Sequence, residues 1–190
     1  MGIAGTQYLI RQGRMSSDNV IDRLTHRLFG SPLLRNDLRG ALVEEIVGIA
    51  LEPEWELCSG DWAACDLVHS ASKLRIQVKQ SAARQSWHKG ECPPPKPRFS
   101  IATKTGRWED GDQWIAERSR NAEIFVFAWH PLTGEAADHR DPDQWEFYVV
   151  PEVALPRQSS ISLAGIRRLA TAVAVAGLPE AVTGAVTLAS

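Results

Sequence analysis

The sequence is poor in cysteine and has no long apolar run. It has three cysteines, Cys58, Cys65 and Cys92, and no two of them form a CxxC pair. This odd number of thiols argues against a disulfide framework and suits a reducing compartment. The most apolar stretch, Leu169 to Gly177, is far shorter than the ~20 residues that a membrane span needs. The amino-terminal residues also lack the apolar segment of a secretory signal. We therefore expect a soluble, cytoplasmic protein with no membrane partner.

Several motifs of common enzyme classes are also absent. The sequence contains no P-loop, no Rossmann glycine fingerprint, no G-x-S-x-G elbow and no H-E-x-x-H motif. These absences argue against nucleotide-dependent, hydride-transfer, serine-hydrolase and zinc-protease chemistry. The chain of 190 residues, with 44% hydrophobic and 23% charged residues, matches an ordinary globular domain with a substantial core.

The small net charge of −2 conceals two strongly charged blocks. Residues 69–107 carry nine basic side chains and one acidic, for a net charge of +8. Residues 108–152 carry three basic and eleven acidic side chains, for a net charge of −8. Clustered cations of this kind bind polyanions such as nucleic acids. The alternative interpretation is that the two blocks pair with each other on the folded surface or within a homodimer.

The amino-terminal third of the chain is predicted to be helical. Residues 1–37 are a lead-in, with a helix that starts near Ser16 and stops at Gly30 to Pro32. A second helix is predicted over residues 38–51, capped by Asn36 or Asp37, with a wide apolar face that suits packing against a sheet. Residues 38–190 are then expected to form a single domain.

Alternating apolar and polar residues predict a series of strands after the second helix. The predicted strands are residues 54–58, 64–68, 74–79, 98–103, 123–129 and 145–150. Further helices are predicted at 82–87 and at 163–176, the last one capped by Ser162 and ended by Gly177. This order favours an α/β or α+β domain built around a central sheet.

One predicted strand carries an unusual set of polar residues. Within residues 74–79, Gln77 and Lys79 project from the same face, roughly 7 Å apart. Asp66 lies on the preceding predicted strand, and the second helix carries Glu44 and Glu45 near its middle. One carboxylate from the helix, one from a strand and the Gln/Lys pair can therefore converge.

Such a cluster suits the hydrolysis of a phosphodiester. Asp66, the amide oxygen of Gln77 and the carbonyl of Val78 are hard oxygen ligands of the kind that Mg²⁺ prefers. The cation polarises the phosphoryl oxygen and acidifies a water molecule. Lys79 can orient that water or offset the charge that develops on phosphorus. The alternative for Lys79 is a side chain that merely extends from a sheet edge to solvent.

These residues, in this order, resemble the PD-(D/E)XK nuclease superfamily, in the variant where Gln replaces the second acid. The resemblance lies in Arg39-Gly40-Ala41-Leu42-Val43-Glu44, in Asp66-Leu67, in Ile76-Gln77-Val78-Lys79-Gln80-Ser81-Ala82 and in Gln85-Ser86-Trp87. It continues in Arg120-Asn121-Ala122-Glu123-Ile124-Phe125-Val126-Phe127 and in Gln144-Trp145-Glu146-Phe147-Tyr148-Val149. The resemblance covers roughly residues 38 to 170. Within the superfamily, these segments are similar to those of a small bacterial group.

The resemblance implies a restriction-endonuclease-like α/β fold, with a central mixed β-sheet flanked by helices. It also implies Mg²⁺- or Mn²⁺-dependent hydrolysis of DNA, with Glu44 and Asp66 as metal-linked acids, Gln77 as a ligand or water-positioning residue and Lys79 as the catalytic lysine. Contacts to DNA are expected from the basic block, at Arg75, Arg84, Gln85 and Lys89. Cutting of both strands would favour a homodimer.

Two departures leave an alternative open. Gln77 removes one negative charge from the metal site, and Cys65 stands where the proline of the motif would be. A DNA-binding or assembly module that has kept the fold and lost hydrolysis is therefore the second hypothesis.

Two further groups of residues have competing interpretations. Cys65, His69, His88 and Cys92 are the right types for Zn²⁺, but their spacing is unlike that of common structural zinc sites, so buried free thiols are the default. Trp87 and Trp108 lie in or beside the basic block, where they can stack on bases, although packing against the sheet is the commoner role.

Overall fold

The computed structural model describes residues 16–58, 64–90, 96–109 and 113–189. The chain divides into two compact units at the boundary between Ser31 and Pro32. The described part of the first unit contains helix α1 (Ser17–Phe29), whose first turn is capped by the Ser16 hydroxyl, which accepts a hydrogen bond from the Asn19 amide. The sequence-based prediction of a helix starting near Ser16 is confirmed. No residue of α1 is buried.

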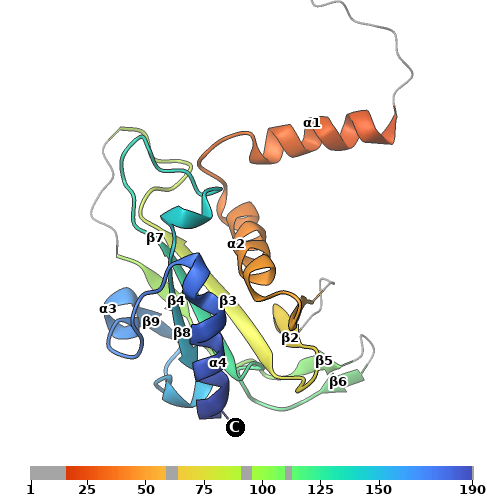
Figure 1. Cartoon of the computed structure of the whole chain (residues 1–190), viewed down its shortest axis with the longest axis vertical. Helices are drawn as coiled ribbons and strands as arrows, with labels where there is room; N and C mark the ends of the chain where they lie inside the picture. Colours follow the sequence, from red (N-terminus) through yellow and green to blue (C-terminus); the bar gives the residue numbers. More distant parts are fainter. Residues whose placement is uncertain (1–15, 59–63, 91–95, 110–112, 190) are drawn as a thin grey trace, which may run out of the picture. The chain divides into compact units, whose positions relative to one another are not determined.

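The second unit is organised around a mixed sheet of five strands (Figure 1). The strand order is β1 (Trp55–Leu57), β2 (Leu67–His69), β3 (Arg75–Ala82), β7 (Ile124–His130) and β8 (Glu146–Pro151). Neighbouring strands are antiparallel except for β3 and β7, which run parallel over seven residue pairs. The predicted α/β class, with a central mixed sheet flanked by helices, is confirmed.

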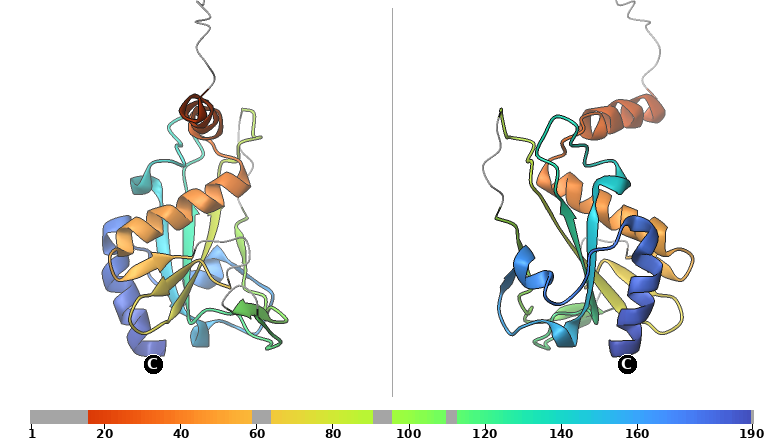
Figure 2. Two further views of the ribbon diagram at one scale, coloured as in Figure 1. Left: turned by 90° about the vertical axis from the view of Figure 1, so that its right-hand side faces the viewer. Right: turned by 60° about the vertical axis from the view of Figure 1, so that its left-hand side comes forward.

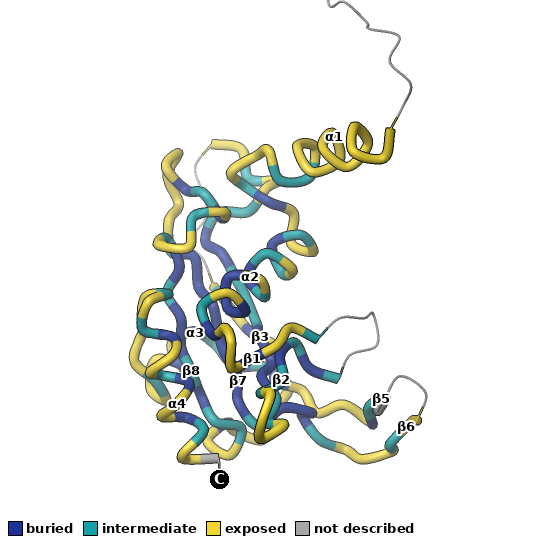
Figure 3. The backbone as a smooth tube through the Cα atoms, turned by 45° about the vertical axis from the view of Figure 1, so that its right-hand side comes forward, coloured by how far each residue is buried: buried dark blue, intermediate teal, exposed yellow. Residues whose placement is uncertain are grey.

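Other elements cover each face of the sheet (Figure 2), and each face has its own apolar core. Helices α2 (Asn36–Leu51) and α4 (Leu178–Ala189) pack on one face, against side chains such as Ile76 and Val126. The other face packs against the two-stranded ladder of β4 (Arg98–Ser100) with β9 (Ser160–Ser162), and against the short helix α3 (Leu163–Ile166). Every residue of β7 is buried, as expected for a central strand with both faces covered (Figure 3).

Helix α2 is tied to β3 by polar side chains at its amino-terminal end. Arg39 is fully buried, and its Nε donates to the Gln80 side chain at 2.6 Å. The Asn36 side-chain oxygen accepts from Arg39 and from Gln80. The predicted cap by Asn36 or Asp37 is therefore wrong, because the Asn36 oxygen is used by these contacts. The helix starts two residues earlier than predicted, after Arg35, and no side chain caps it.

The predicted helix over residues 82–87 is also wrong. Strand β3 continues to Ala82, where it pairs with His130, and residues 83–90 form turns and bends. Alanine and glutamine favour a helix locally, but pairing with the fully buried β7 outweighs that preference. The 41 residues between β3 and β7 instead include the β4 strand and a hairpin of β5 (Arg107–Glu109) with β6 (Gln113–Ile115).

The carboxyl-terminal part differs from the prediction for a similar reason. The Ser162 hydroxyl does cap a helix, but α3 ends at Ile166 rather than near residue 176. Val173 forms two backbone hydrogen bonds with Phe147, which draws this segment to the edge of β8. Helix α4 then begins at Leu178, and Pro179 lies in its first turn, where proline is well tolerated.

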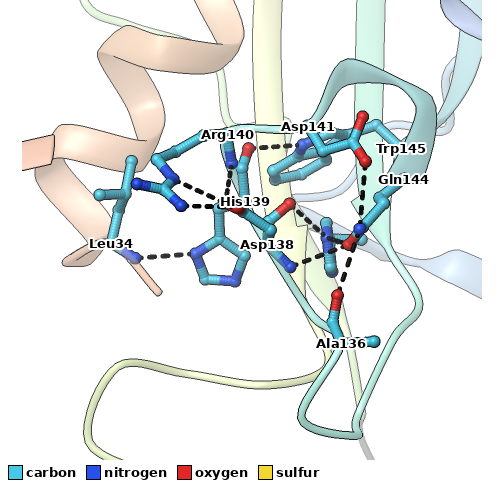
Figure 4. Close-up of polar contacts among 9 residues, drawn as sticks. Leu34, Ala136, Asp138, His139, Arg140, Asp141, Gln144 and Trp145 are labelled. Atoms are coloured by element: carbon cyan, nitrogen blue, oxygen red, sulfur yellow. Dashed lines mark hydrogen bonds and ion pairs between the residues drawn. The ribbon is translucent and has the colours of Figure 1, made fainter. Parts of the chain in front are cut away.

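A loop between β7 and β8, residues 131–145, is closed by polar contacts around His139 (Figure 4). The Nδ1 atom of His139 accepts from the Leu34 amide, and its carbonyl accepts from the Trp145 indole at 2.9 Å. Gln144 accepts from the Asp138 amide at 2.8 Å. Burial lowers the pKa of His139 to about 4, so the ring is neutral near pH 7. We infer that these contacts hold the loop in place.

A buried ion pair anchors the segment that follows β4. The side chain of Arg120 is 6% exposed and pairs with Glu152 at 2.6 Å, while also donating to the carbonyls of Ile101 and Pro156. We expect Arg120→Met to lower the free energy of unfolding by about 3 kcal/mol, because it leaves buried acceptors unpaired. Arg140→Met, which breaks the more exposed pair with Asp138, should lower it by less than about 1 kcal/mol. Urea unfolding compares the two, and equal losses would contradict this role for Arg120.

Candidate active site

Asp66 is fixed by hydrogen bonds on both sides of its peptide. It lies just before β2, its amide donates to the Ile76 carbonyl at 2.9 Å, and its carbonyl accepts from the Cys58 amide at 2.9 Å. Strand β2 pairs with β3 only at Arg75 and Ile76, so it does not cover the next residues of β3. The Asp66 carboxylate occupies that position, where its Oδ2 accepts from the Val78 amide at 2.6 Å.

Gln77 supplies the second contact to this carboxylate. Its Nε2 donates to Oδ2 of Asp66, and the side chain is buried in the sheet. Among the described residues, none donates a hydrogen bond to the Gln77 amide oxygen. An amide at this position holds Asp66 by donating to it, whereas a carboxylate would add a third negative charge beside Asp66 and Glu44.

Glu44 comes from the middle of α2, which packs against β3 and β1. Burial, and secondly the negative charge of Asp66, raise the pKa of Glu44 to about 7, while Lys79 opposes the shift. Its neighbour Glu45 is exposed. Of the two glutamates that the sequence left open, Glu44 is the one whose charge interacts with Asp66 and Lys79.

Lys79 follows Gln77 by two residues on β3 and is half-buried. Burial lowers the pKa of its ammonium, while the negative charges of Asp66 and Glu44 raise it. Burial also raises the pKa of Asp66, against the Val78 amide and Lys79, which both lower it. The structure thus brings together Glu44, Asp66, Gln77 and Lys79, which we call the carboxylate–lysine cluster.

Lys104 is a further cation near this cluster that the sequence did not single out. Its positive charge lowers the pKa of both Asp66 and Lys79. Its backbone is held by two hydrogen bonds with Ser119, at 2.7 and 3.3 Å. The only sequence signal was its membership of the basic block, because the contact depends on how the chain folds back after β4.

The oxygen atoms of the cluster fit a divalent cation such as Mg²⁺. Two carboxylates whose negative charges oppose each other gain from a cation between them, and the charge of Asp66 is, after burial, the second cause of the raised pKa of Glu44. The Val78 amide points to Asp66, and the carbonyl of the same strand residue points to the same sheet edge. Asp66, Gln77 and Val78 therefore remain the predicted ligands.

A site with three or more closely placed His, Cys, Asp or Glu side chains is not found within the described ranges. The Sγ atoms of Cys58 and Cys65 lie 3.4 Å apart as free thiols, and burial raises the pKa of Cys65. The His69 ring contacts Trp55 and Ser72. Cys92, the fourth member of the zinc alternative, lies outside the described residues. For Cys65, these contacts match the default of a buried free thiol.

Three of the four residues predicted to contact DNA form hydrogen bonds or ion pairs within the fold. Arg75 forms an ion pair with Glu123 at 2.5 Å. Arg84 donates to the Gly134 carbonyl, and Gln85 donates to the Ala82 carbonyl. Lys89 is exposed after the end of β3. The role of these four residues in DNA binding stays a prediction.

The two charge blocks do pair in part. Arg75 and Arg107 of the basic block form ion pairs with Glu123 and Glu117 of the acidic block. Exposed cations remain at Lys73, Lys89, Lys96 and Lys104. Part of the basic block is therefore paired with the acidic block, and part of it remains exposed to solvent.

The tryptophans beside the basic block are more exposed than expected. Trp87 is 64% exposed, and Trp108 is 38% exposed on the β5–β6 hairpin, so the expectation that they pack against the sheet is wrong. Trp108 instead contacts Trp114 across the hairpin, with ring centroids 5.4 Å apart.

Comparisons with known proteins give one structural likeness. No protein-family model matches the chain, and no curated protein matches it. Among solved structures, the chain is similar to the bacterial homing endonuclease I-Ssp6803I, with a TM-score of 0.38 and 21% sequence identity, over 67% of this chain and 77% of that one. No helix in the described part of the chain is long and apolar enough to span a membrane.

Proposed function

We propose that this chain is a metal-dependent DNA nuclease of the PD-(D/E)XK type, with the carboxylate–lysine cluster as its active site. The observation that carries the proposal is the convergence of four side chains from three elements. Glu44 comes from α2, Asp66 from the segment before β2, and Gln77 and Lys79 from β3. The motif order in the sequence and the charge coupling in the fold support the same assignment.

The chemistry follows from the roles that these side chains can take. Asp66, the Gln77 amide oxygen and the Val78 carbonyl would hold the cation. The carboxylate of Glu44 would add a second negative charge near the cation. When bound, Mg²⁺ supplies Lewis-acid polarisation of the phosphoryl oxygen and a more acidic water. Lys79, whose pKa is lowered by burial, orients the attacking water and stabilises the negative charge that develops on the phosphate. Gln77 holds the Asp66 carboxylate in place through its amide donor.

The second candidate is a DNA-binding or assembly module without hydrolytic activity. The observation that favours it is Gln77, which leaves the cluster with two carboxylates rather than three. Weaker metal binding would follow from the lost charge.

A cleavage assay on the wild-type protein separates the two candidates. Supercoiled plasmid and single-stranded circular DNA are each incubated with Mg²⁺, Mn²⁺ or EDTA, and DNA binding is measured in parallel. We expect nicked or linear products with Mg²⁺ or Mn²⁺ and intact DNA with EDTA. Salt-dependent DNA binding by a well-folded protein that cuts neither substrate would overturn the nuclease proposal in favour of the binding module.

A further inference from the structure

Two adjoining cavities lie on the face of the sheet that carries Gln77 and Lys79. The first, of about 550 Å³, is lined by Arg75, which lies two residues before Gln77 on the same face of β3. The second, of about 470 Å³, shares four wall residues with the first, namely Thr103, Arg118, Arg120 and Glu152. We call the two together the arginine groove.

The groove carries an excess of positive charge. Each glutamate in its wall is already paired with an arginine: Glu117 with Arg107, Glu123 with Arg75 and Glu152 with Arg120. Two arginines are left over. Among the described residues, the Arg118 side chain donates to the Thr103 hydroxyl alone, from Nε at 3.3 Å, and Arg157 contacts no carboxylate. Two exposed guanidinium groups, with the hydroxyls of Thr103 and Ser159 beside them, form a surface suited to phosphate.

The walls of the groove are held rigidly together. The buried Arg120 side chain donates to the Ile101 carbonyl at 2.7 Å on one side and to the Pro156 carbonyl on the other. It therefore joins the segment that carries Thr103 to the segment that carries Arg157. A preformed groove loses little conformational entropy when a ligand binds.

The groove also adjoins the candidate active site. Thr103 in its wall is the direct neighbour of Lys104, whose charge acts on Asp66 and Lys79. A strand that is bound at the carboxylate–lysine cluster and runs past Lys104 would therefore continue toward the groove.

We propose that the arginine groove binds the backbone phosphates of a nucleic-acid strand next to the cleavage position, with Arg118 and Arg157 as the phosphate-binding residues. The inference rests on the proposed nuclease function and assigns strand binding to these two arginines, which lie outside the 69–107 block.

The test is the salt dependence of oligonucleotide binding by the double variant Arg118→Ala/Arg157→Ala. Fluorescence anisotropy with labelled duplex and single-stranded oligonucleotides, in EDTA, gives Kd at several salt concentrations. Because each phosphate contact contributes about 0.7–0.9 to the slope of log K against log salt, the slope should fall by roughly 1.4–1.8. Affinity near 0.1 M salt should fall by a factor on the order of 10 to 100.

Matched variants separate a phosphate contact from a general effect of charge. Arg23→Ala/Arg168→Ala removes two exposed cations that lie outside both the groove and the 69–107 block, and should change Kd by less than about threefold. Arg118→Lys/Arg157→Lys keeps both charges and should retain most of the wild-type slope. Thermal unfolding checks that each variant is folded.

The possible results distinguish a failure of this inference from a failure of the proposed nuclease function on which it rests. If the wild type binds with a salt-dependent Kd, and both the Kd and the slope are unchanged in Arg118→Ala/Arg157→Ala, the assignment of the groove to phosphate binding is overturned. The nuclease proposal is then unaffected. Affinity that does not rise from a dinucleotide to a twelve-nucleotide strand indicates a site for a small phosphate compound and overturns the strand assignment. Absence of binding to any nucleic acid by the wild type overturns both proposals.

Discussion

Replacing Lys79 by methionine should slow DNA cleavage by about 10²–10³-fold, because the change removes the cation that faces the developing phosphate charge. Methionine keeps the length and apolar character of the side chain, so the packing of β3 is preserved. The ammonium is half-buried and interacts with Asp66 and Glu44, so its loss is not compensated by solvent. The rate is measured as nicking of supercoiled plasmid in Mg²⁺, with enzyme in excess over DNA.

The control for this prediction is Lys96→Met, which removes an exposed lysine elsewhere in the basic block. It should cut at the wild-type rate within about threefold, whereas Lys79→Met should retain DNA affinity within about tenfold. Equal rates for wild type and Lys79→Met would remove Lys79 from the mechanism, even with cutting established.

Replacing Glu44 by glutamine should have opposite effects on stability and on cleavage. In the folded protein the pKa of Glu44 is about 7, against an ordinary value of 4.5. Between these two pH values the unfolded chain has released a proton that the folded protein keeps, so folding stability falls as pH rises. After allowance for solvent screening, we expect Glu44→Gln to gain about 1–2 kcal/mol at pH 8 and little at pH 4.

Urea unfolding at the two pH values, in EDTA, measures this stability difference. The adjacent exposed Glu45→Gln should change stability by less than about 0.5 kcal/mol at either pH. Cleavage by Glu44→Gln should fall, because the negative charge near the cation is lost, while Glu45→Gln should cut normally. A gain in stability shared by both variants would contradict the coupling between Glu44 and Asp66.

The sequence predicted the central sheet well because its strands carry strong local signals. The alternation at residues 74–79 and the apolar runs at 123–129 and 145–150 each correspond to a strand of the sheet. The sequence indicated that Asp66, Gln77 and Lys79 can converge, because i and i+2 positions of a strand share a face and Asp66 lies on the preceding predicted strand. The sequence did not decide between Glu44 and Glu45, because that choice depends on how α2 is rotated about its axis relative to the sheet.

The errors occurred where tertiary contacts outweigh local preference. Residues 82–87 have helix-forming side chains, yet β3 extends to Ala82 because β7 pairs with it over its full length. The segment near Val173 pairs with Phe147 instead of continuing a helix. In both cases the decisive partner is distant in the sequence, so no local pattern reports it.

The further cations near the site were missed for a related reason. Lys104, Arg118 and Arg157 come from segments with no regular pattern, and their positions depend on the anchoring by Arg120. Counting charge over the 69–107 block identified an excess of cations but not which of them pair with acids. Arg75 and Glu123, for example, form an ion pair although they are distant in the sequence, so only the folded structure shows which cations are paired.

The assignment of the carboxylate–lysine cluster as a nuclease site is tested most directly by comparing the wild type with Asp66→Asn in one plasmid-cleavage assay at fixed Mg²⁺. Asparagine keeps the size of the side chain and removes the charge beside Gln77 and Lys79. We predict Mg²⁺-dependent nicking by the wild type, lost in EDTA, and a rate at least about 10²-fold lower for a folded Asp66→Asn protein. Cleavage that is equal in the two proteins would contradict the assignment of the carboxylate–lysine cluster as a metal-dependent nuclease site.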